Sequence, residues 1–288
     1  MKVLVTGVAG QLGYDVRREL IKRGHECIGS DLAAGDAPMD ITDAKAALDT
    51  LTAVRPDAVI HCAAWTAVDA AEDEPEQAHA VNAGGTRNIA GACAQLGCKM
   101  VYISTDYVFD GSGSKPWKPE DRCFRPLNVY GRTKLEGETA VAELTEKYFI
   151  VRIEWAFGVN GDNFIKTMLR VGAGRDEIRV VSDQIGALTY TPDLAGLLVD
   201  MIETEKYGYY HAANEGGFVS RCDLVRELFR QAGLKTKVIP VTTEEYGPTK
   251  AVRPLNSRFD TSKLAASGFT PLPDWKDAIG RYLKEINK

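Results

Sequence analysis

The fold of this chain is decided near its N-terminus, by the stretch Lys2-Val3-Leu4-Val5-Thr6-Gly7-Val8-Ala9-Gly10-Gln11-Leu12-Gly13. A short apolar run is followed directly by three glycines with the spacing Gly-x-x-Gly-x-x-Gly. Glycines between a strand and a helix permit a tight turn and let a pyrophosphate approach the backbone N–H groups at the helix N-terminus. An ordinary strand-to-helix turn has the same appearance, so the flanking sequence must decide between the two interpretations.

The flanking sequence favours a repeated strand–helix–strand pattern. Residues 2–6 and 25–31 have the composition of strands, and residues 11–23 between them have helical spacing. The pattern continues with helices at 45–54 and 74–96, strands at 57–63, 98–105 and 148–153, and a helix that starts near residue 129. Strands that are almost continuously apolar, such as 100–103, are typical of a parallel sheet covered by helices on both faces. The sequence therefore predicts an α/β fold with a doubly wound, Rossmann-like parallel sheet.

The second half predicts a smaller α/β lobe for the substrate. Its elements are shorter, with strands expected at 178–181, 209–212 and 237–241 and helices at 163–171, 193–202, 221–231 and 275–286. We therefore expect a dinucleotide-binding domain over residues 1–154 and a mainly substrate-binding lobe over 155–288. Part of 176–213 should return to the first domain. Residues 106–127 show neither the helical nor the strand periodicity of apolar residues and should form a long functional or mobile loop.

Composition excludes several classes of partner. The net charge of the 288 residues is −5 and no basic block stands out, so nucleic acid is not expected as a partner. No run reaches the roughly 18 apolar residues of a membrane span, and the apolar N-terminal stretch is too short for a signal peptide. The six cysteines contain no C-x-x-C pair, which indicates reduced, structural thiols: Cys27, Cys62, Cys93, Cys98, Cys123 and Cys222. We expect a cytoplasmic protein without membrane contact.

The dinucleotide interpretation extends beyond the glycines. Besides Gly7, Gly10 and Gly13, the loop residues Gln11 and Leu12 should contact the cofactor.

Acidic residues further along suit the adenosine part. Asp31 follows the second strand and could accept hydrogen bonds from the adenosine ribose, which favours NADH over NADPH; alternatively it only caps the next turn. Asp40 and Ile41, expected at the end of the next short strand, could frame the adenine.

A candidate proton donor lies in the second informative stretch, Tyr130-Gly131-Arg132-Thr133-Lys134. On a helix, a spacing of four residues puts Tyr130 and Lys134 on one face. The same Y-x-x-x-K spacing recurs at Tyr246 and Lys250, but Pro248 interrupts that copy, so its side chains should not align. The first copy is therefore the functional candidate.

These residue types suit carbonyl reduction. A tyrosine ordinarily has a pKa of about 10, and a nearby cation such as Lys134 would lower that pKa by about 1 to 3 units. Thr105 ends a strand at the sheet edge where ligands bind, so its hydroxyl could hydrogen-bond the reacting oxygen. Each residue alone has a structural explanation, but in this order they indicate nicotinamide-dependent carbonyl or alcohol redox chemistry. The four histidines show no zinc spacing, and neither a serine-hydrolase elbow nor a P-loop occurs, so no metal site is predicted.

Several longer motifs resemble one family. The stretch 6–13 with Tyr130, Lys134 and the N-x-x-G-T element at 82–86 resembles the extended short-chain dehydrogenase/reductase superfamily. Within it, four further segments resemble dTDP-4-dehydrorhamnose reductases from end to end. These segments are Ser104-Thr105-Asp106-Tyr107-Val108-Phe109-Asp110-Gly111, Pro126-Leu127-Asn128-Val129-Tyr130-Gly131, Gly161-Asp162-Asn163-Phe164 and Arg253-Pro254-Leu255-Asn256-Ser257.

The resemblance implies specific roles. It implies a catalytic set of Thr105, Tyr130 and Lys134, with Tyr130 and Lys134 also at the cofactor. The other implied contacts are Ala63, Ala64 and Thr66 to the cofactor and Asp106, Tyr107, Trp155, Asn163 and Arg253 to the substrate. The implied reaction uses NADH or NADPH to reduce the C4 keto group of dTDP-4-dehydro-L-rhamnose to dTDP-L-rhamnose. A monomer or homodimer is expected; Mg²⁺ at a subunit interface stays open, since the sequence does not predict it.

Two departures leave the substrate open. Where the family usually has Arg-Thr-Ser-Trp, this chain has Arg152-Ile153-Glu154-Trp155, and Leu188 stands where a proline is usual. Glu154 adds a charge near the expected sugar site. The alternatives are a reductase or epimerase of another nucleotide-linked deoxysugar, or a non-catalytic regulatory subunit like that of methionine adenosyltransferase. The intact catalytic set argues against the last.

Overall fold

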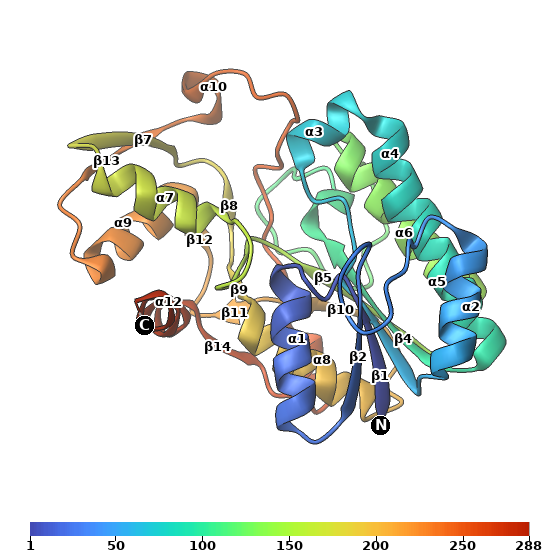
Figure 1. Cartoon of the computed structure of the whole chain (residues 1–288). Helices are drawn as coiled ribbons and strands as arrows, with labels where there is room; N and C mark the ends of the chain where they lie inside the picture. The colour runs from blue at the N-terminus through green and yellow to red at the C-terminus, as the bar shows by residue number, and fades with distance from the viewer. Residues whose placement is uncertain (288) are drawn as a thin grey trace.

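A six-stranded, entirely parallel sheet forms the centre of the larger lobe in the computed structural model, which describes residues 1–287 (Figure 1). The strand order is β2-β1-β3-β4-β5-β10. The bounds are β1 (Lys2–Thr6), β2 (Glu26–Ser30), β3 (Ala58–His61), β4 (Lys99–Thr105), β5 (Tyr148–Ile153) and β10 (Gly208–Ala212). From β1 the chain proceeds to β2 on one side and to β3 on the other, so the order reverses between β1 and β3.

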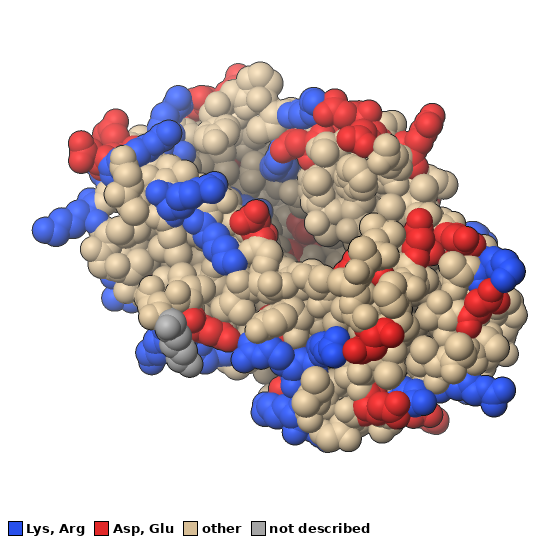
Figure 2. Space-filling view, in the orientation of Figure 1, with Lys and Arg blue, Asp and Glu red and all other residues tan. Residues whose placement is uncertain are grey.

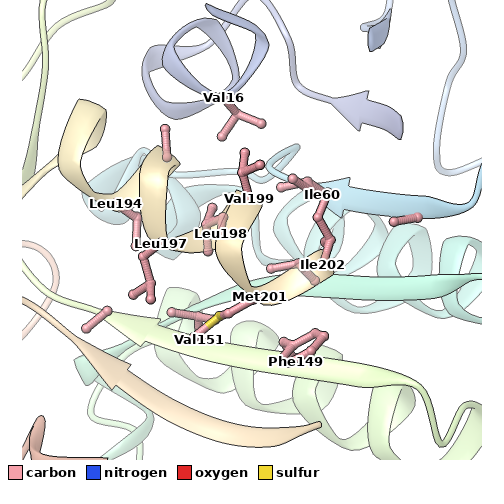
Figure 3. Packing of buried hydrophobic residues seen from close by; sticks show 14 of the residues in the cluster. Val16, Ile60, Phe149, Val151, Leu194, Leu197, Leu198, Val199, Met201 and Ile202 are labelled. Carbon is pink, nitrogen blue, oxygen red and sulfur yellow. The ribbon is translucent and has the colours of Figure 1, made fainter. Parts of the chain in front are cut away.

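Helices cover both faces of this sheet, as the apolar strands predicted. On one face lie α1 (Gln11–Lys22) and α8 (Thr191–Ile202), which pack with Val3 and Val5 in one core. Figure 3 shows Val16 of α1 beside Val199 of α8 in this core. The opposite face packs against α2 (Ala44–Val54), α5 (Thr86–Leu96) and α6 (Val129–Leu144). Leu4, between Val3 and Val5, belongs to this second core. Alternate strand residues thus fill opposite layers, and the predicted doubly wound α/β fold is confirmed.

A smaller lobe has its own core beside the sheet (Figure 1). Its main elements are α7 (Phe164–Ala173), β7 (Glu177–Val181), α9 (Arg221–Ala232), β13 (Lys237–Val241) and α12 (Trp275–Ile286). β7 and β13 pair in parallel. Short elements complete the fold: α3 (Val68–Asp73), α4 (Pro75–His79), a π-helical turn η1 (Ala80–Gly85), a 3₁₀ turn η2 (Asp106–Val108), β6 (Ala156–Phe157), β8 (Ile185–Gly186), β9 (Thr189–Tyr190), β11 (Asn214–Glu215), β12 (Val219–Ser220), α10 (Thr243–Tyr246), α11 (Ser262–Ala266) and β14 (Leu272–Asp274).

Two local expectations differ from the structure. The helix expected over 74–96 is a series of α4, η1 and α5, preceded by α3, and Asn82 in the π turn bonds to the Trp65 backbone. The short strand expected to end at Asp40 and Ile41 does not form. The Asp40 carboxylate instead accepts hydrogen bonds from the backbone and hydroxyl of Thr42, which closes a turn.

The chain passes between the lobes more than once. Within 176–213, β7 lies in the small lobe whereas α8 and β10 pack in the large one. The division into 1–154 and 155–288 stays a prediction. Over residues 1–287, no helix combines the length and the apolarity that crossing a bilayer requires.

Candidate active site

A cleft of about 910 Å³ opens at the carboxyl edge of the sheet, between the two lobes (Figure 2). Figure 2 shows it as a hollow in the middle of the molecule, with acidic side chains at its rim and floor. Most of the predicted site residues line it: Gly7, Gly10, Gln11, Leu12, Asp31, Asp40, Ile41, Ala63, Ala64, Thr66, Thr105, Asp106, Tyr107, Tyr130, Lys134, Trp155 and Asn163. The structure therefore brings together segments that lie more than a hundred residues apart in sequence.

The glycine loop packs too tightly for side chains. Gly7 has φ +66°, and a Cβ there would lie 2.6 Å from the Ala63 nitrogen. Gly13 does not line the cleft; a Cβ on it would lie 2.1 Å from the Gly7 carbonyl oxygen. Gly13 therefore holds the first turn of α1 against the loop, while Gly7 and Gly10 face the cleft.

The N-terminus of α1 is suited to an anion. Its N-cap, Gly10, supplies no side-chain hydrogen bond, whereas side chains of Asp43, Asn128, Asn163 and Ser220 cap α2, α6, α7 and α9. Uncapped backbone N–H groups at a helix start bind phosphate, because their partial positive charge points at the ligand. The loop thus fits the pyrophosphate of a dinucleotide.

Asp31 follows β2 beside the glycine loop, and it stabilises that loop. Its carboxylate accepts hydrogen bonds from the backbone N–H groups of Ala9, at 3.2 Å, and Leu32, at 2.9 Å. The side chain caps a turn and lines the cleft at once, so the two interpretations of Asp31 are compatible.

Helix α6 presents Tyr130 and Lys134 to the cleft from its first two turns. The Asn128 side chain caps the helix. Gly131 lets α6 approach the turn η2, since a Cβ on Gly131 would lie 2.2 Å from the Tyr107 carbonyl oxygen. Lys134 is 3% exposed, with its Nζ 4.2 Å from the centre of the Tyr102 ring. Burial lowers the pKa of Lys134 to about 7.

The pKa of Tyr130 differs from the expectation. Burial raises it above the ordinary tyrosine value, the Thr105 hydroxyl lowers it, and the neighbouring Asp106 raises it again. The expected lowering by Lys134 is wrong for this structure, because desolvation exceeds every favourable contact. The phenol keeps its proton at neutral pH, which is the form that a proton donor needs.

A buried network orients these groups from behind. Arg152 and Glu138, 0% and 1% exposed, form a double contact with Nε–Oε1 at 2.8 Å and Nη2–Oε2 at 2.7 Å. Ser104 donates to the same Glu138 carboxylate at 2.5 Å. The network joins β4, β5 and α6 at the residues next to Thr105 and one turn after Lys134, so it fixes their relative position.

Asp106 is a second buried acid beside the candidate catalytic residues. It accepts hydrogen bonds from the hydroxyls of Thr105, at 3.0 Å, and of Ser257. Burial raises its pKa to about 6, although both hydroxyls act in the opposite direction.

The far end of the cleft contains a strained tryptophan. Trp155 follows β5 with φ +44°, a left-handed conformation that is uncommon for a non-glycine residue. The Thr189 hydroxyl holds the preceding carbonyl, of Glu154, at 2.7 Å. Within residues 1–287 neither carboxylate oxygen of Glu154 makes a hydrogen bond of ordinary geometry. Burial, followed by the Asp106 charge, raises its pKa well above the ordinary value, although the Ala187 backbone acts in the opposite direction.

Arg221 completes this end, and the sequence analysis missed it. Its guanidinium carbon lies 3.8 Å from the centre of the Trp155 ring and 4.8 Å from that of Phe164. No motif marks Arg221: it is one arginine in an amphipathic helix, and only the packing of the small lobe turns it into the cleft.

Two predicted substrate contacts are otherwise engaged. Arg253 does not line the cleft, because its guanidinium binds Asp69 at 3.1 and 2.6 Å. Asn163 lines the cleft, but its side chain caps α7 and donates to Gln11 at 2.8 Å, which ties the lobes together. Over residues 1–287, no three His, Cys, Asp or Glu side chains are grouped in a way that could hold a metal ion.

Comparison with known proteins points in one direction. The family model described as "RmlD substrate binding domain" matches residues 1–288. The chain is 42% identical over 282 residues to a dTDP-4-dehydrorhamnose reductase of Streptomyces griseus, which covers 96% of this chain and 91% of that protein.

Solved structures agree with this match. A dTDP-4-dehydrorhamnose reductase of Clostridium acetobutylicum superposes with a TM-score of 0.94 at 39% identity, over 100% of both chains. The Bacillus anthracis protein of the same name, in complex with NADP, gives 0.93 at 41% identity, over 99% of this chain and 100% of the other.

Proposed function

We propose, from the premise that this chain belongs to the RmlD substrate-binding-domain family, that it reduces the C4 keto group of dTDP-4-dehydro-L-rhamnose to give dTDP-L-rhamnose. One observation carries the proposal: a single cleft joins a glycine loop suited to a dinucleotide with a buried tyrosine and lysine on one helix. The chain is similar to proteins named dTDP-4-dehydrorhamnose reductase, so dTDP-4-dehydrorhamnose is the first substrate to test.

The cofactor would lie across the loop. The backbone N–H groups at the start of α1 would hold its pyrophosphate, Asp31 its adenosine ribose, and Asp40 and Ile41 its adenine. Ala63, Ala64 and Thr66 would line its path, and Lys134 would hold the nicotinamide ribose. When bound, the reduced nicotinamide supplies a hydride to the carbonyl carbon.

The protein's part is to deliver the proton and to orient the carbonyl. Tyr130 gives its phenolic proton to the C4 oxygen as that oxygen gains negative charge, and the product is an alcohol. Thr105 would turn its hydroxyl proton from Asp106 to the same oxygen when the substrate binds, and Lys134 holds positive charge near the resulting phenolate. The lysine pKa of about 7 leaves a sizeable fraction protonated at neutral pH.

The cofactor preference is a finer proposal. NAD(P) binding agrees with the NADP complex of the Bacillus anthracis relative. For this chain we favour NADH, because the Asp31 carboxylate next to the glycine loop would repel a 2′-phosphate.

We place the enzyme in the cytoplasm, as a monomer or a homodimer with a nucleotide sugar as its small-molecule partner. Its six cysteines are all free, three of them buried, which suits a reducing compartment. Cell fractionation and light scattering would test these points.

A panel of nucleotide 4-keto-sugars, assayed by the loss of reduced-cofactor absorbance, tests the activity. We expect turnover with dTDP-4-dehydro-L-rhamnose above all others. Turnover with a different sugar alone would assign the enzyme to another deoxysugar pathway. No turnover with any sugar, together with a stoichiometric enzyme partner in a pull-down, would favour the regulatory-subunit alternative.

A further inference from the structure

The charges that line the cleft are unevenly distributed. Acidic side chains are distributed along its length: Asp31, Asp40, Asp106, Glu154 and Asp162. Among the described residues that line it, the lysine and arginine side chains are only Lys134 and Arg221. Lys134 lies at the catalytic end. Arg221 is thus the cation of the far end, where the nucleotide part of a sugar substrate would extend.

Arg221 has no direct anionic partner among residues 1–287. It begins α9, and within residues 1–287 its guanidinium forms neither a hydrogen bond nor an ion pair of 4.0 Å or less. The carboxyl groups whose charges act on Arg221 are those of Asp106 and Glu154. Burial raises the pKa of each of them. Both carboxyl groups act on Arg221 through space without a hydrogen bond, so the guanidinium donors stay available for a ligand.

Other cations nearby are already engaged. Arg253 is held by Asp69 at 2.6 Å, and Arg258 donates to the Asn256 side chain at 2.8 Å. Lys166 donates to the carbonyls of Val159 and Gly161, both at 2.6 Å. Arg221 differs from all three in facing the cleft with its five N–H donors free.

The position of Arg221 is built rather than accidental. Its guanidinium lies over the Trp155 ring at 3.8 Å, and that ring is set by a left-handed backbone which Thr189 holds through the Glu154 carbonyl. Gly186 leaves the space, since a Cβ there would lie 2.2 Å from Glu154 Oε2 and 3.1 Å from the Trp155 ring. Stacking on an aromatic face orients a guanidinium without using any of its hydrogen-bond donors.

We propose that Arg221 binds the phosphate groups of the nucleotide sugar, held in place by Trp155 and Phe164. This rests on the proposed function in so far as the substrate is a nucleoside diphosphate sugar. A planar guanidinium matches two phosphate oxygens at once, and a diphosphate supplies acceptors for the N–H donors that the protein leaves free. Arg221 thereby fixes the nucleotide and so places the sugar carbon before Tyr130.

The test is a binding titration that needs no keto-sugar. Thymidine 5′-diphosphate, uridine 5′-diphosphate and the parent nucleosides are titrated into the full-length protein, the variant Arg221→Gln and the control Arg226→Gln. Arg226 lies on the same helix, exposed, and pairs with Asp223. Arg221→Gln should weaken diphosphate binding about 10- to 100-fold, the worth of lost charge-assisted hydrogen bonds, and leave nucleoside binding unchanged.

A second variant separates recognition from folding. Arg221→Lys keeps the charge but loses the paired donors, so its affinity should lie between those of the wild type and Arg221→Gln. Equal diphosphate affinity in wild type and Arg221→Gln overturns the proposal, as does an equal loss for diphosphate and nucleoside. If a diphosphate binds through Arg221 but no keto-sugar is turned over in the activity assay, the proposed function is wrong and this inference still holds.

Discussion

The two ends of the cleft are built in different ways. The cofactor end is made mainly of backbone, namely three glycines and an uncapped helix start, and the Asp31 carboxylate stabilises this loop from the side. The end that we assign to the nucleotide sugar is made of side chains from distant segments, with Trp155 after β5 and Arg221 on α9, and Gly186 leaves room beside Trp155. A backbone site is fixed by local spacing, whereas a side-chain site requires the whole small lobe to be in place.

Tyr130 lies between the two ends, and its removal should have the largest effect. Tyr130→Phe deletes the proton donor while the ring still fills its place. We expect kcat to fall about 10²- to 10⁴-fold, with cofactor affinity little changed. Steady-state kinetics and a cofactor titration measure the two quantities.

The second Y-x-x-x-K copy supplies the control. Tyr246 is 54% exposed at the end of α10, so Tyr246→Phe should leave kcat unaltered. Equal losses in both variants would mean that the Tyr130 effect is not proton transfer.

The glycine loop can be distorted by a substitution at a residue that does not line the cleft. Gly13→Ala places a methyl group 2.1 Å from the Gly7 carbonyl, so the loop must move. We expect cofactor affinity to fall at least about tenfold and the free energy of unfolding to drop by about 1 to 3 kcal/mol. Isothermal titration and chemical unfolding would measure these changes.

Gly91→Ala is the matched control. A Cβ on this α5 glycine meets no atom within 4 Å, and alanine favours a helix by about 1 kcal/mol. If Gly13→Ala bound the cofactor as well as Gly91→Ala does, the loop would not depend on this contact.

The same contrast explains what the sequence could predict. Periodicity and glycine spacing predicted the sheet, its layers and the cofactor loop, because each depends on neighbouring residues. The face shared by Tyr130 and Lys134 followed from helical geometry. No local pattern shows that Arg221 lines the cleft. The resemblance implied a substrate contact for Arg253, whose direction is instead set by an ion pair with Asp69 from a distant part of the chain. The spacing of Tyr130 and Lys134 also predicted a lowered pKa for Tyr130. This prediction was wrong, because spacing does not show that the tyrosine is buried.

Glu154 tests the side-chain end through stability. The raised pKa means that the folded protein keeps a proton which the unfolded chain releases. This stabilising contribution is complete below the ordinary glutamate pKa and is lost as the pH rises toward the folded-state pKa. Glu154→Gln removes the titration, so the free energy of unfolding of the variant should rise relative to that of the wild type as the pH increases.

Thermal unfolding from pH 4 to pH 8 would reveal that difference. Asp106 is present in both proteins, so its own titration near pH 6 contributes to both curves. Glu215 is exposed, so the stability of the control variant Glu215→Gln should change with pH in parallel with that of the wild type. Parallel curves for Glu154→Gln as well would show that the Glu154 carboxyl is not buried without a partner.

The smallest expected effect concerns cofactor choice. Asp31→Ala removes the charge that would repel a 2′-phosphate, so the kcat/KM ratio of NADPH to NADH should rise about five- to tenfold, or about 1 kcal/mol. Asp49→Ala, on the exposed face of α2, is the control. An unchanged ratio in Asp31→Ala would leave Asp31 with only its structural role at Ala9 and Leu32.

The proposed reaction requires a bound nicotinamide that faces the sugar carbonyl beside Tyr130. The most direct measurement is the transfer of label from cofactor deuterated at nicotinamide C4, on the transferred face, to dTDP-4-dehydro-L-rhamnose, with the product analysed by mass spectrometry and NMR. The account predicts one deuterium on C4 of the product sugar. Product that carries no deuterium at C4, or carries it at another carbon, would contradict it.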